Sequence, residues 1–187
     1  MKNRILQITG LVFLAMGITL GSSCKKTFPP RPEVQPTPAP NSGCNDRDSP
    51  NYDPNAEGNG DCQYVYVTSY EISYYPAQDN GSDWDFGFGS ATNADLILNI
   101  GYNGEDVLIF QSTEKTNQNP GAPAIWQEPR QLKLRNEIYR WDLWDYDATS
   151  PNDPIASGTF NPLDELDNGN ITLQSGGTQL VIHYIIK

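Results

Sequence analysis

Histidine is almost absent from this sequence, and positively charged residues are scarce. His183 is the single histidine among 187 residues, which disfavours catalysis by histidine and zinc binding through histidine ligands. Twelve lysines and arginines stand against 23 aspartates and glutamates, which gives a formal net charge of −11 at pH 7. Sequence-independent binding of nucleic acid needs many cations facing phosphates, so we expect no nucleic-acid partner.

The sequence also lacks the common signatures of enzymes and of helical folds. No Gly-x-Ser-x-Gly motif is present, and Gly87-Phe88-Gly89 is a lone Gly-x-Gly that neither follows a strand nor opens a helix. No window of about a dozen residues has the apolar period of an amphipathic helix. We therefore expect no long helix, although residues 164–167 could form one short turn, and a protein that is not an enzyme.

The one long apolar run lies at the start of the chain. Residues 5–20 follow two basic residues, but the run is short and interrupted by Gln7 and Thr9, which favours an export signal over a spanning helix. The segment Leu20-Gly21-Ser22-Ser23-Cys24 resembles a bacterial lipoprotein signal. That resemblance implies removal of the signal peptide at 1–23, lipidation of Cys24, and a membrane partner reached through the lipid. The implied location is the cell envelope, with the outer membrane as the default.

Two further cysteines and a proline-rich stretch follow. If Cys24 carries lipid, Cys44 and Cys62 are left to pair, and an oxidising compartment outside the cytoplasm allows a disulfide. Between them and the signal, residues 25–43 contain six prolines and almost no large apolar side chains. Such a segment cannot bury enough surface to fold, so we expect 24–43 to be an extended tether.

Residues 44–63 form a short segment dense in Asp, Asn and Gly, which favour turns. It resembles a cysteine-bounded module of proteins secreted by Gram-negative bacteria. The matching residues are Gly43-Cys44, Asn51-Tyr52, Pro54, Ala56, Cys62 and Tyr64. We interpret its aspartates as turn-forming residues of a disulfide-closed loop.

From residue 64 to 187 the pattern indicates strands throughout. Apolar and polar residues alternate with a period of two, and Asn103-Gly104 and Gly176-Gly177 are hairpin signals. This predicts an all-β domain, an antiparallel sandwich or barrel of eight strands. The runs expected to be strands are 64–75, 95–102, 106–112, 129–134, 138–145, 154–160, 170–175 and 178–186.

Acidic residues continue the inward-facing stripe of the run 138–145. Tyr139, Trp141 and Leu143 share their parity with Asp145 and Asp147. Carboxylates on an apolar stripe are very costly to bury alone, so we expect the strand to end at the rim of the domain. Alternate loops of an antiparallel sandwich lie at the same end, which would bring 76–94, 113–128 and 146–153 together. Repulsion between the acids of these loops would favour a hard cation, and Ca²⁺ fits best.

The acidic residues also resemble the pattern of C2 domains, the calcium-binding β-sandwiches of eight strands. Asp145, Asp147 and Asp153 match the third-loop motif D-x-D-x5-D, and Asp95 opens the strand after the first loop. Residues 116–128, with Asn119-Pro120, Trp126 and Glu128, look like a stretched version of another C2 segment. The position of the last strand resembles the permuted topology of that family.

Carried over, the resemblance implies calcium ligands on three segments, with Asp85 the first-loop ligand and Asp83 the second choice. Aspartates that only form turns and bind no ion are the alternative. The implied calcium ligands are Asp85, Asp95, Asp145, Asp147 and Asp153.

Trp84, Phe86 and Phe88 make an aromatic cluster in the first loop, either a lid packed on the domain or a contact for ligand or membrane. We expect a non-catalytic binding module ordered by Ca²⁺, with an unknown protein or glycan partner. One alternative is a carbohydrate-binding module with structural calcium, which would stack sugars on Trp84, Trp126 or tyrosines. The other is calcium-dependent binding of phospholipid.

Overall fold

The computed structural model describes residues 43–187. The expected signal peptide at 1–23, the lipidation site Cys24 and the tether up to residue 42 lie outside the described residues. Among residues 43–187, no helix is both long enough and apolar enough to cross a membrane. The helices of this part are two short 3-10 turns in loops, η1 (Gly89–Thr92) and η2 (Pro162–Asp164).

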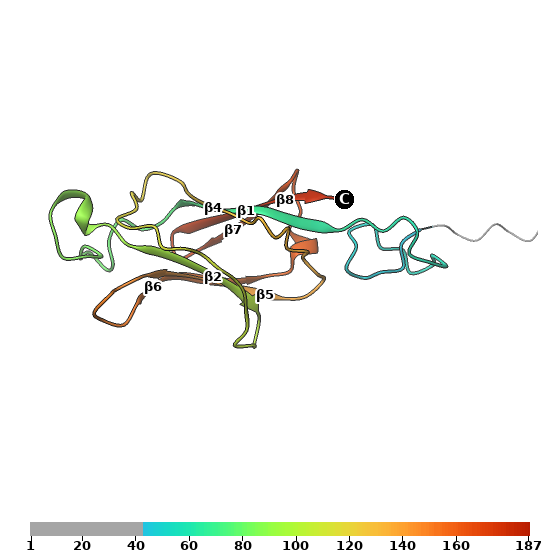
Figure 1. The fold of residues 1–187 in the computed structure, drawn as a ribbon, viewed down its shortest axis with the longest axis horizontal. Helices are drawn as coiled ribbons and strands as arrows, with labels where there is room; N and C mark the ends of the chain where they lie inside the picture. The colour runs from blue at the N-terminus through green and yellow to red at the C-terminus, as the bar shows by residue number, and fades with distance from the viewer. Residues whose placement is uncertain (1–42) are drawn as a thin grey trace, which may run out of the picture. The chain divides into compact units, whose positions relative to one another are not determined.

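Eight strands form two four-stranded antiparallel sheets, which confirms the predicted fold class (Figure 1). One sheet has the order β4-β1-β8-β7 and the other β3-β2-β5-β6. The last strand, β8, lies beside the first, in the middle of its sheet. The strands are β1 (Val65–Tyr74), β2 (Leu96–Tyr102), β3 (Leu108–Gln111), β4 (Ala124–Gln127), β5 (Tyr139–Asp145), β6 (Asp153–Phe160), β7 (Asn170–Ser175) and β8 (Thr178–Ile186).

The core lies between the two sheets and is built from alternate residues of each strand. On β5, Tyr139, Trp141 and Leu143 are buried and their neighbours are partly exposed, as the period of two predicts. Opposite Trp141 on β6 stands Gly158, where an added Cβ would lie 2.7 Å from the indole Nε1. The indole therefore occupies the space that any other residue would need at this position.

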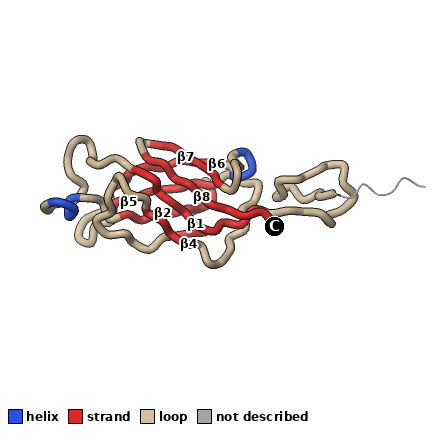
Figure 2. The backbone as a smooth tube through the Cα atoms, turned by 90° about the horizontal axis from the view of Figure 1, so that it is seen from above, coloured by secondary structure: helices blue, strands red, loops and turns tan. Residues whose placement is uncertain are grey.

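Two glycine-containing turns close hairpins where the sequence predicts them. Gly176 and Gly177 have φ values of 55° and 76° and connect the paired residues Ser175 and Thr178, so this turn requires backbone conformations that glycine adopts freely. The Asn103-Gly104 hairpin joins β2 to β3. Figure 2 shows the strands gathered in the middle of the domain, with loops at both ends.

The fourth strand lies at Ala124–Gln127, earlier than the expected run 129–134. That run pairs with β1 only at its end, where Lys133 forms an isolated bridge with Tyr66. The alternation of β4 places Ala124 and Trp126 inside and Ile125 outside. Beyond it, Glu128 is buried and binds Arg130 through two contacts, Oε1 to Nε at 2.9 Å and Oε2 to Nη2 at 2.7 Å. The chain turns at residues 128–131, where the Gln131 amide donates to the Glu128 carbonyl at 3.4 Å and Gln131 has a φ of 53°, so 129–134 is not extended throughout.

Residues 43–63 form a loop closed by the disulfide Cys44–Cys62, which confirms that pairing. Its aspartates accept local hydrogen bonds: the Asp48 amide donates to Asp46 Oδ1 at 3.0 Å. The loop also contacts the sandwich, because the Tyr64 hydroxyl donates to Asp46 Oδ2 at 2.7 Å and the Asn136 amide donates to Asp48 Oδ1 at 3.0 Å. These contacts agree with turn-forming roles for the aspartates.

Replacing Gly158 by alanine should destabilise the sandwich, because the new Cβ would overlap the buried Trp141 indole. Overpacking of this kind costs about 1–3 kcal/mol, so the urea midpoint should fall. Gly60→Ala is the matched control, since nothing lies within 4 Å of a Cβ at that position. A Gly158→Ala variant as stable as the wild type would contradict the packing described.

Candidate metal centre

Three loops meet at one end of the sandwich and are joined by backbone hydrogen bonds. The Tyr146 amide, at the start of the β5–β6 loop, donates to the Asp95 carbonyl at 2.8 Å. Leu96 and Lys115 exchange amide–carbonyl hydrogen bonds of 3.0 Å, which ties the β3–β4 loop to the start of β2. The Gln118 amide donates to the carbonyl of Ala94 at 2.9 Å. The shared end predicted for these loops is therefore present.

Asp145 ends β5 and is the most deeply placed acid of this end. Its side chain is fully buried. Oδ1 accepts a hydrogen bond of 2.6 Å from the Asp95 amide. Oδ2 is buried and has no hydrogen-bond partner among residues 43–187. One half of the carboxylate is thus satisfied, and the other half is desolvated without compensation.

Asp95 links the three loops through its backbone and its side chain. Its amide binds Asp145, its carbonyl binds Tyr146, and its Oδ1 accepts a hydrogen bond of 2.6 Å from the Asn117 amide. Asn117 has a positive φ of 50°, a conformation that asparagine adopts more readily than most residues. The turn at Asn117, in the β3–β4 loop, thereby fixes the position of the Asp95 carboxylate.

Burial and neighbouring negative charges raise the pKa values of Asp145 and Asp85. Burial raises the pKa of Asp145 to about 6, although the hydrogen bond from the Asp95 amide opposes the shift. The negative charges of Asp85, Asp147 and Asp95 act in the same direction as burial. Burial also raises the pKa of Asp85, as do the charges of Asp95 and Asp147. These four aspartates come from two loops and two strand ends, and they are close enough to interact.

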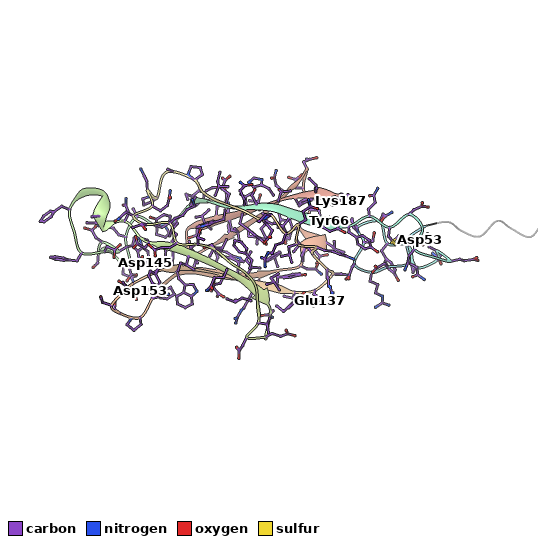
Figure 3. The ribbon with its side chains drawn as sticks, viewed as in Figure 1. Asp53, Tyr66, Glu137, Asp145, Asp153 and Lys187 are labelled. Atoms are coloured by element: carbon purple, nitrogen blue, oxygen red, sulfur yellow. A yellow bond between two sulfur atoms is a disulfide. The ribbon has the colours of Figure 1, made fainter. Side chains whose placement is uncertain are left out.

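The fifth predicted ligand, Asp153, lies directly opposite Asp145 in the β5–β6 register. Figure 3 shows both at the end of the sandwich opposite Glu137 and Lys187. Asp153 is exposed, and Asp147 is partly exposed. Within 43–187, no group of three or more His, Cys, Asp or Glu is spaced to hold a metal ion as it stands. The structure therefore gathers the predicted ligands at one end without converging them on a single point.

The two candidates for the first-loop ligand differ in surroundings. Asp85 is partly exposed and its pKa responds to Asp95 and Asp147. Asp83 is exposed, and its Oδ1 accepts a hydrogen bond of 3.1 Å from Gln78 Nε2. Asp85 is thus the one that belongs to the acidic cluster, which we define as Asp85, Asp95, Asp145 and Asp147.

The aromatic residues of this end separate into packed and exposed ones. The Trp84 indole N–H donates to the Pro76 carbonyl at 2.8 Å, and the ring packs against the core. Trp126 is 5% exposed and donates to the Thr113 carbonyl at 2.7 Å, so it offers no surface for stacking a sugar. Phe86 and Phe88 are 106% and 95% exposed. Two of the three predicted contact residues therefore face solvent beside Asp85.

Sequence reasoning did not find the second-loop contribution to this end. Tyr75 donates its hydroxyl hydrogen to the Gln118 carbonyl, and burial, with the nearby charges of Asp145 and Asp95, raises its pKa. Asn117 holds Asp95 through a backbone amide. Backbone contacts of this kind leave no pattern in the sequence, apart from the turn preference of an asparagine.

No protein-family model matches this chain, and no curated protein sequence matches it either. Among solved structures, a human GIVD cytosolic phospholipase A2 is similar over 67% of this chain and 17% of its own, at 12% identity and a TM-score of 0.45. The chain named BON1-C2B is similar over 67% of this chain and 92% of its own, at 12% identity and a TM-score of 0.41. A C2 domain of plant Extended Synaptotagmin 1 has the same coverage, 11% identity and a TM-score of 0.39. The chain thus spans less than a fifth of the phospholipase, and the assignment of the site rests on its own residues.

Asp145→Asn should stabilise the protein in chelator at neutral pH. A carboxyl group whose pKa rises from 3.8 to about 6 on folding costs stability that grows as pH rises between those values and is complete above the higher one. The amide carries no charge and keeps the acceptor for the Asp95 amide. We expect a gain of about 1–3 kcal/mol at pH 7.5 that disappears as the pH falls towards 4.

Urea unfolding at a series of pH values in chelator measures this difference. Asp83→Asn is the control, because that exposed aspartate lies outside the acidic cluster and should give no pH-dependent gain. An Asp145→Asn variant that is less stable than the wild type at pH 7.5 in chelator would show that the buried carboxylate is already compensated.

Proposed function

We propose that the protein is a non-catalytic binding module of the cell envelope whose loops at one end of the sandwich are ordered by calcium. The observation that carries this proposal is the fully buried Asp145 with its Oδ2 unpartnered among the described residues, next to three further aspartates. Burying a carboxylate without a partner is costly, and a hard cation compensates that cost through oxygen ligands.

The donor set fits a calcium ion in its chemistry. Asp145 and Asp95 each use one carboxylate oxygen to accept a backbone amide, which orients the other oxygen. Asp85 would add a ligand from the β1–β2 loop, and Asp147 and Asp153 from the two ends of the β5–β6 loop. Because these last two are partly or fully exposed, ion binding would have to draw that loop towards Asp85, Asp95 and Asp145. Bound calcium would supply positive charge that neutralises the cluster.

Localisation enters the proposal from the sequence. An export signal at 1–23, a lipid on Cys24 and a proline-rich tether would hold the sandwich outside the cytoplasm, attached to the outer membrane. Extracytoplasmic calcium modules commonly bind with affinities of about 10⁻⁴–10⁻³ M, in keeping with the calcium levels outside cells. A mostly preformed acidic cluster with one adjustable loop is consistent with affinity in that range.

Calcium-dependent contact with phospholipid is a second candidate, favoured by the exposed Phe86 and Phe88. Both rings project from the loop that carries Asp85, and neither is covered by the described part of the chain. Exposed aromatic side chains next to a cation site can enter the interfacial region of a bilayer, while the cation attracts anionic headgroups. The net negative charge of the protein would otherwise oppose that approach.

Calcium should raise the thermal unfolding midpoint of the protein, because a ligand that binds only the folded state stabilises it. At a calcium concentration about 100 times the dissociation constant, the gain is about 2.7 kcal/mol. Asp147→Asn should remove most of the shift. Glu137→Gln makes the same chemical change at the opposite end of the sandwich and should leave the shift intact (Figure 3). Equal midpoints in calcium and in chelator would refute the calcium proposal.

The double variant Phe86→Ala/Phe88→Ala separates membrane contact from calcium binding. If the second candidate holds, the wild type co-sediments with phosphatidylserine vesicles in calcium, and the double variant binds at least about tenfold less. Its calcium-induced thermal shift should equal that of the wild type, since neither ring is a ligand. If the wild type keeps the thermal shift but does not co-sediment with the vesicles, membrane contact is ruled out and the calcium proposal stands.

A further inference from the structure

The outer face of the β3-β2-β5-β6 sheet carries a depression of about 540 Å³. It lies apart from the buried core, because the residues that line it alternate along their strands with buried ones such as Leu98 and Leu143. Its principal lining residues are Asn99, Asp106, Leu108, Arg140, Asp142 and Trp144.

Polar side chains form a row straight across this face. Asn99 on β2 pairs with Gln111 on β3 and with Asp142 on β5, and Asp142 pairs in turn with Ser157 on β6. Directly paired residues of neighbouring strands have side chains about 5 Å apart on the same face. The four strands therefore present a continuous line of amide, carboxylate and hydroxyl groups.

Two residues that line this depression each carry a buried side-chain atom with no hydrogen-bond partner among residues 43–187. These atoms are the acceptor Asn99 Oδ1 and the donor Arg140 Nε. The nearest carboxylate oxygen to Arg140 Nε is Asp142 Oδ2 at 3.7 Å, which is too far for a hydrogen bond. Hydroxyl groups suit both residues as partners, because a hydroxyl donates one hydrogen bond and accepts others.

Trp144 supplies a flat apolar surface beside the polar row. It is partly exposed and lies between Ile97 on β2 and Pro154 on β6 in the register of the sheet. An indole beside hydrogen-bonding groups is suited to a ligand with one apolar face and a polar edge. A pyranose ring has such a shape, with C–H groups on its face and hydroxyls around its edge.

We propose that this face binds a neutral oligosaccharide, whose ring packs on Trp144 and whose hydroxyls bond to Asn99 and Arg140. The charges of the site favour a neutral ligand: the carboxylates of Asp106 and Asp142 outnumber the Arg140 guanidinium. They would repel sulfates and uronates, and they accept hydrogen bonds from hydroxyl groups. The net charge of −11 acts in the same direction.

This inference goes beyond the calcium proposal and does not require it, since none of these residues is a proposed calcium ligand. The two sites adjoin at Asn152, which lines the depression and whose Oδ1 accepts a hydrogen bond of 3.3 Å from the Asp147 amide. Ordering of the β5–β6 loop by calcium would therefore adjust the edge of the sugar site without creating it.

Binding to an array of immobilised neutral hexose and N-acetylhexosamine oligosaccharides tests the proposal, with uronate and sulfated chains on the same array. The wild type should bind at least one neutral glycan and none of the acidic ones. Trp144→Ala should lose at least about tenfold in affinity, and Asn99→Ala about three- to tenfold. Arg140→Lys, which keeps the charge but removes Nε, should weaken binding to a similar extent as Asn99→Ala.

Two controls make the result specific. Phe88→Ala removes an exposed aromatic ring elsewhere and should leave glycan binding unchanged. Asp147→Asn should remove most of the calcium-induced thermal shift while glycan binding persists, so failure of one proposal is distinguishable from failure of the other. Circular dichroism and unfolding midpoints identify folded variants, and Asn99→Ala and Arg140→Lys decide the outcome if Trp144→Ala does not fold. No binding to any neutral glycan, a preference for acidic chains, or full affinity in these folded variants would overturn the proposal.

Discussion

The hydrogen bond from the Asp95 amide to the buried Asp145 carboxylate determines the architecture of the acidic end. It joins the start of β2 to the end of β5, and therefore joins the loops that precede and follow these strands. Asp95 in turn accepts hydrogen bonds from the Asn117 and Tyr146 amides, so this one residue connects three loops. An electrostatic cost accompanies this arrangement, because Asp145 is buried with one oxygen unpartnered and with other carboxylates nearby. We infer that calcium relieves that cost, which would make the end of the sandwich responsive to the ion.

The sandwich can carry this cost because its stability comes from elsewhere. Twenty-three buried apolar residues fill the space between the two sheets, and Trp141 packs so closely on β6 that only glycine fits opposite it. Destabilising groups at functional sites persist where the surrounding fold holds them in place. The packed core thus holds the strands in place, the strands position the loops, and the loops keep the acidic residues together despite their electrostatic repulsion.

The two proposed surfaces use different chemistry on one scaffold. The loop end gathers carboxylates and exposed phenylalanines, which suits a cation and an apolar contact. The outer sheet face carries a tryptophan among amide, guanidinium and carboxylate groups, which suits a neutral polyol. Both use the alternation of β5: its inward parity ends in Asp145, and its outward parity carries Arg140, Asp142 and Trp144. One strand therefore contributes to both surfaces.

The sequence alone determined the fold class, seven of the eight strands and the disulfide, because alternation, hairpin glycines and cysteine count are local signals. It also brought the acids to one end, since the topology of an antiparallel sandwich dictates which loops meet. Only the tertiary structure decided the position of β4, which is followed by a turn at residues 128–131 that interrupts the run 129–134. It likewise decided that Trp126 is buried and Trp144 partly exposed. Which face of a strand meets the core, and which oxygen finds a partner, depends on residues distant in the chain.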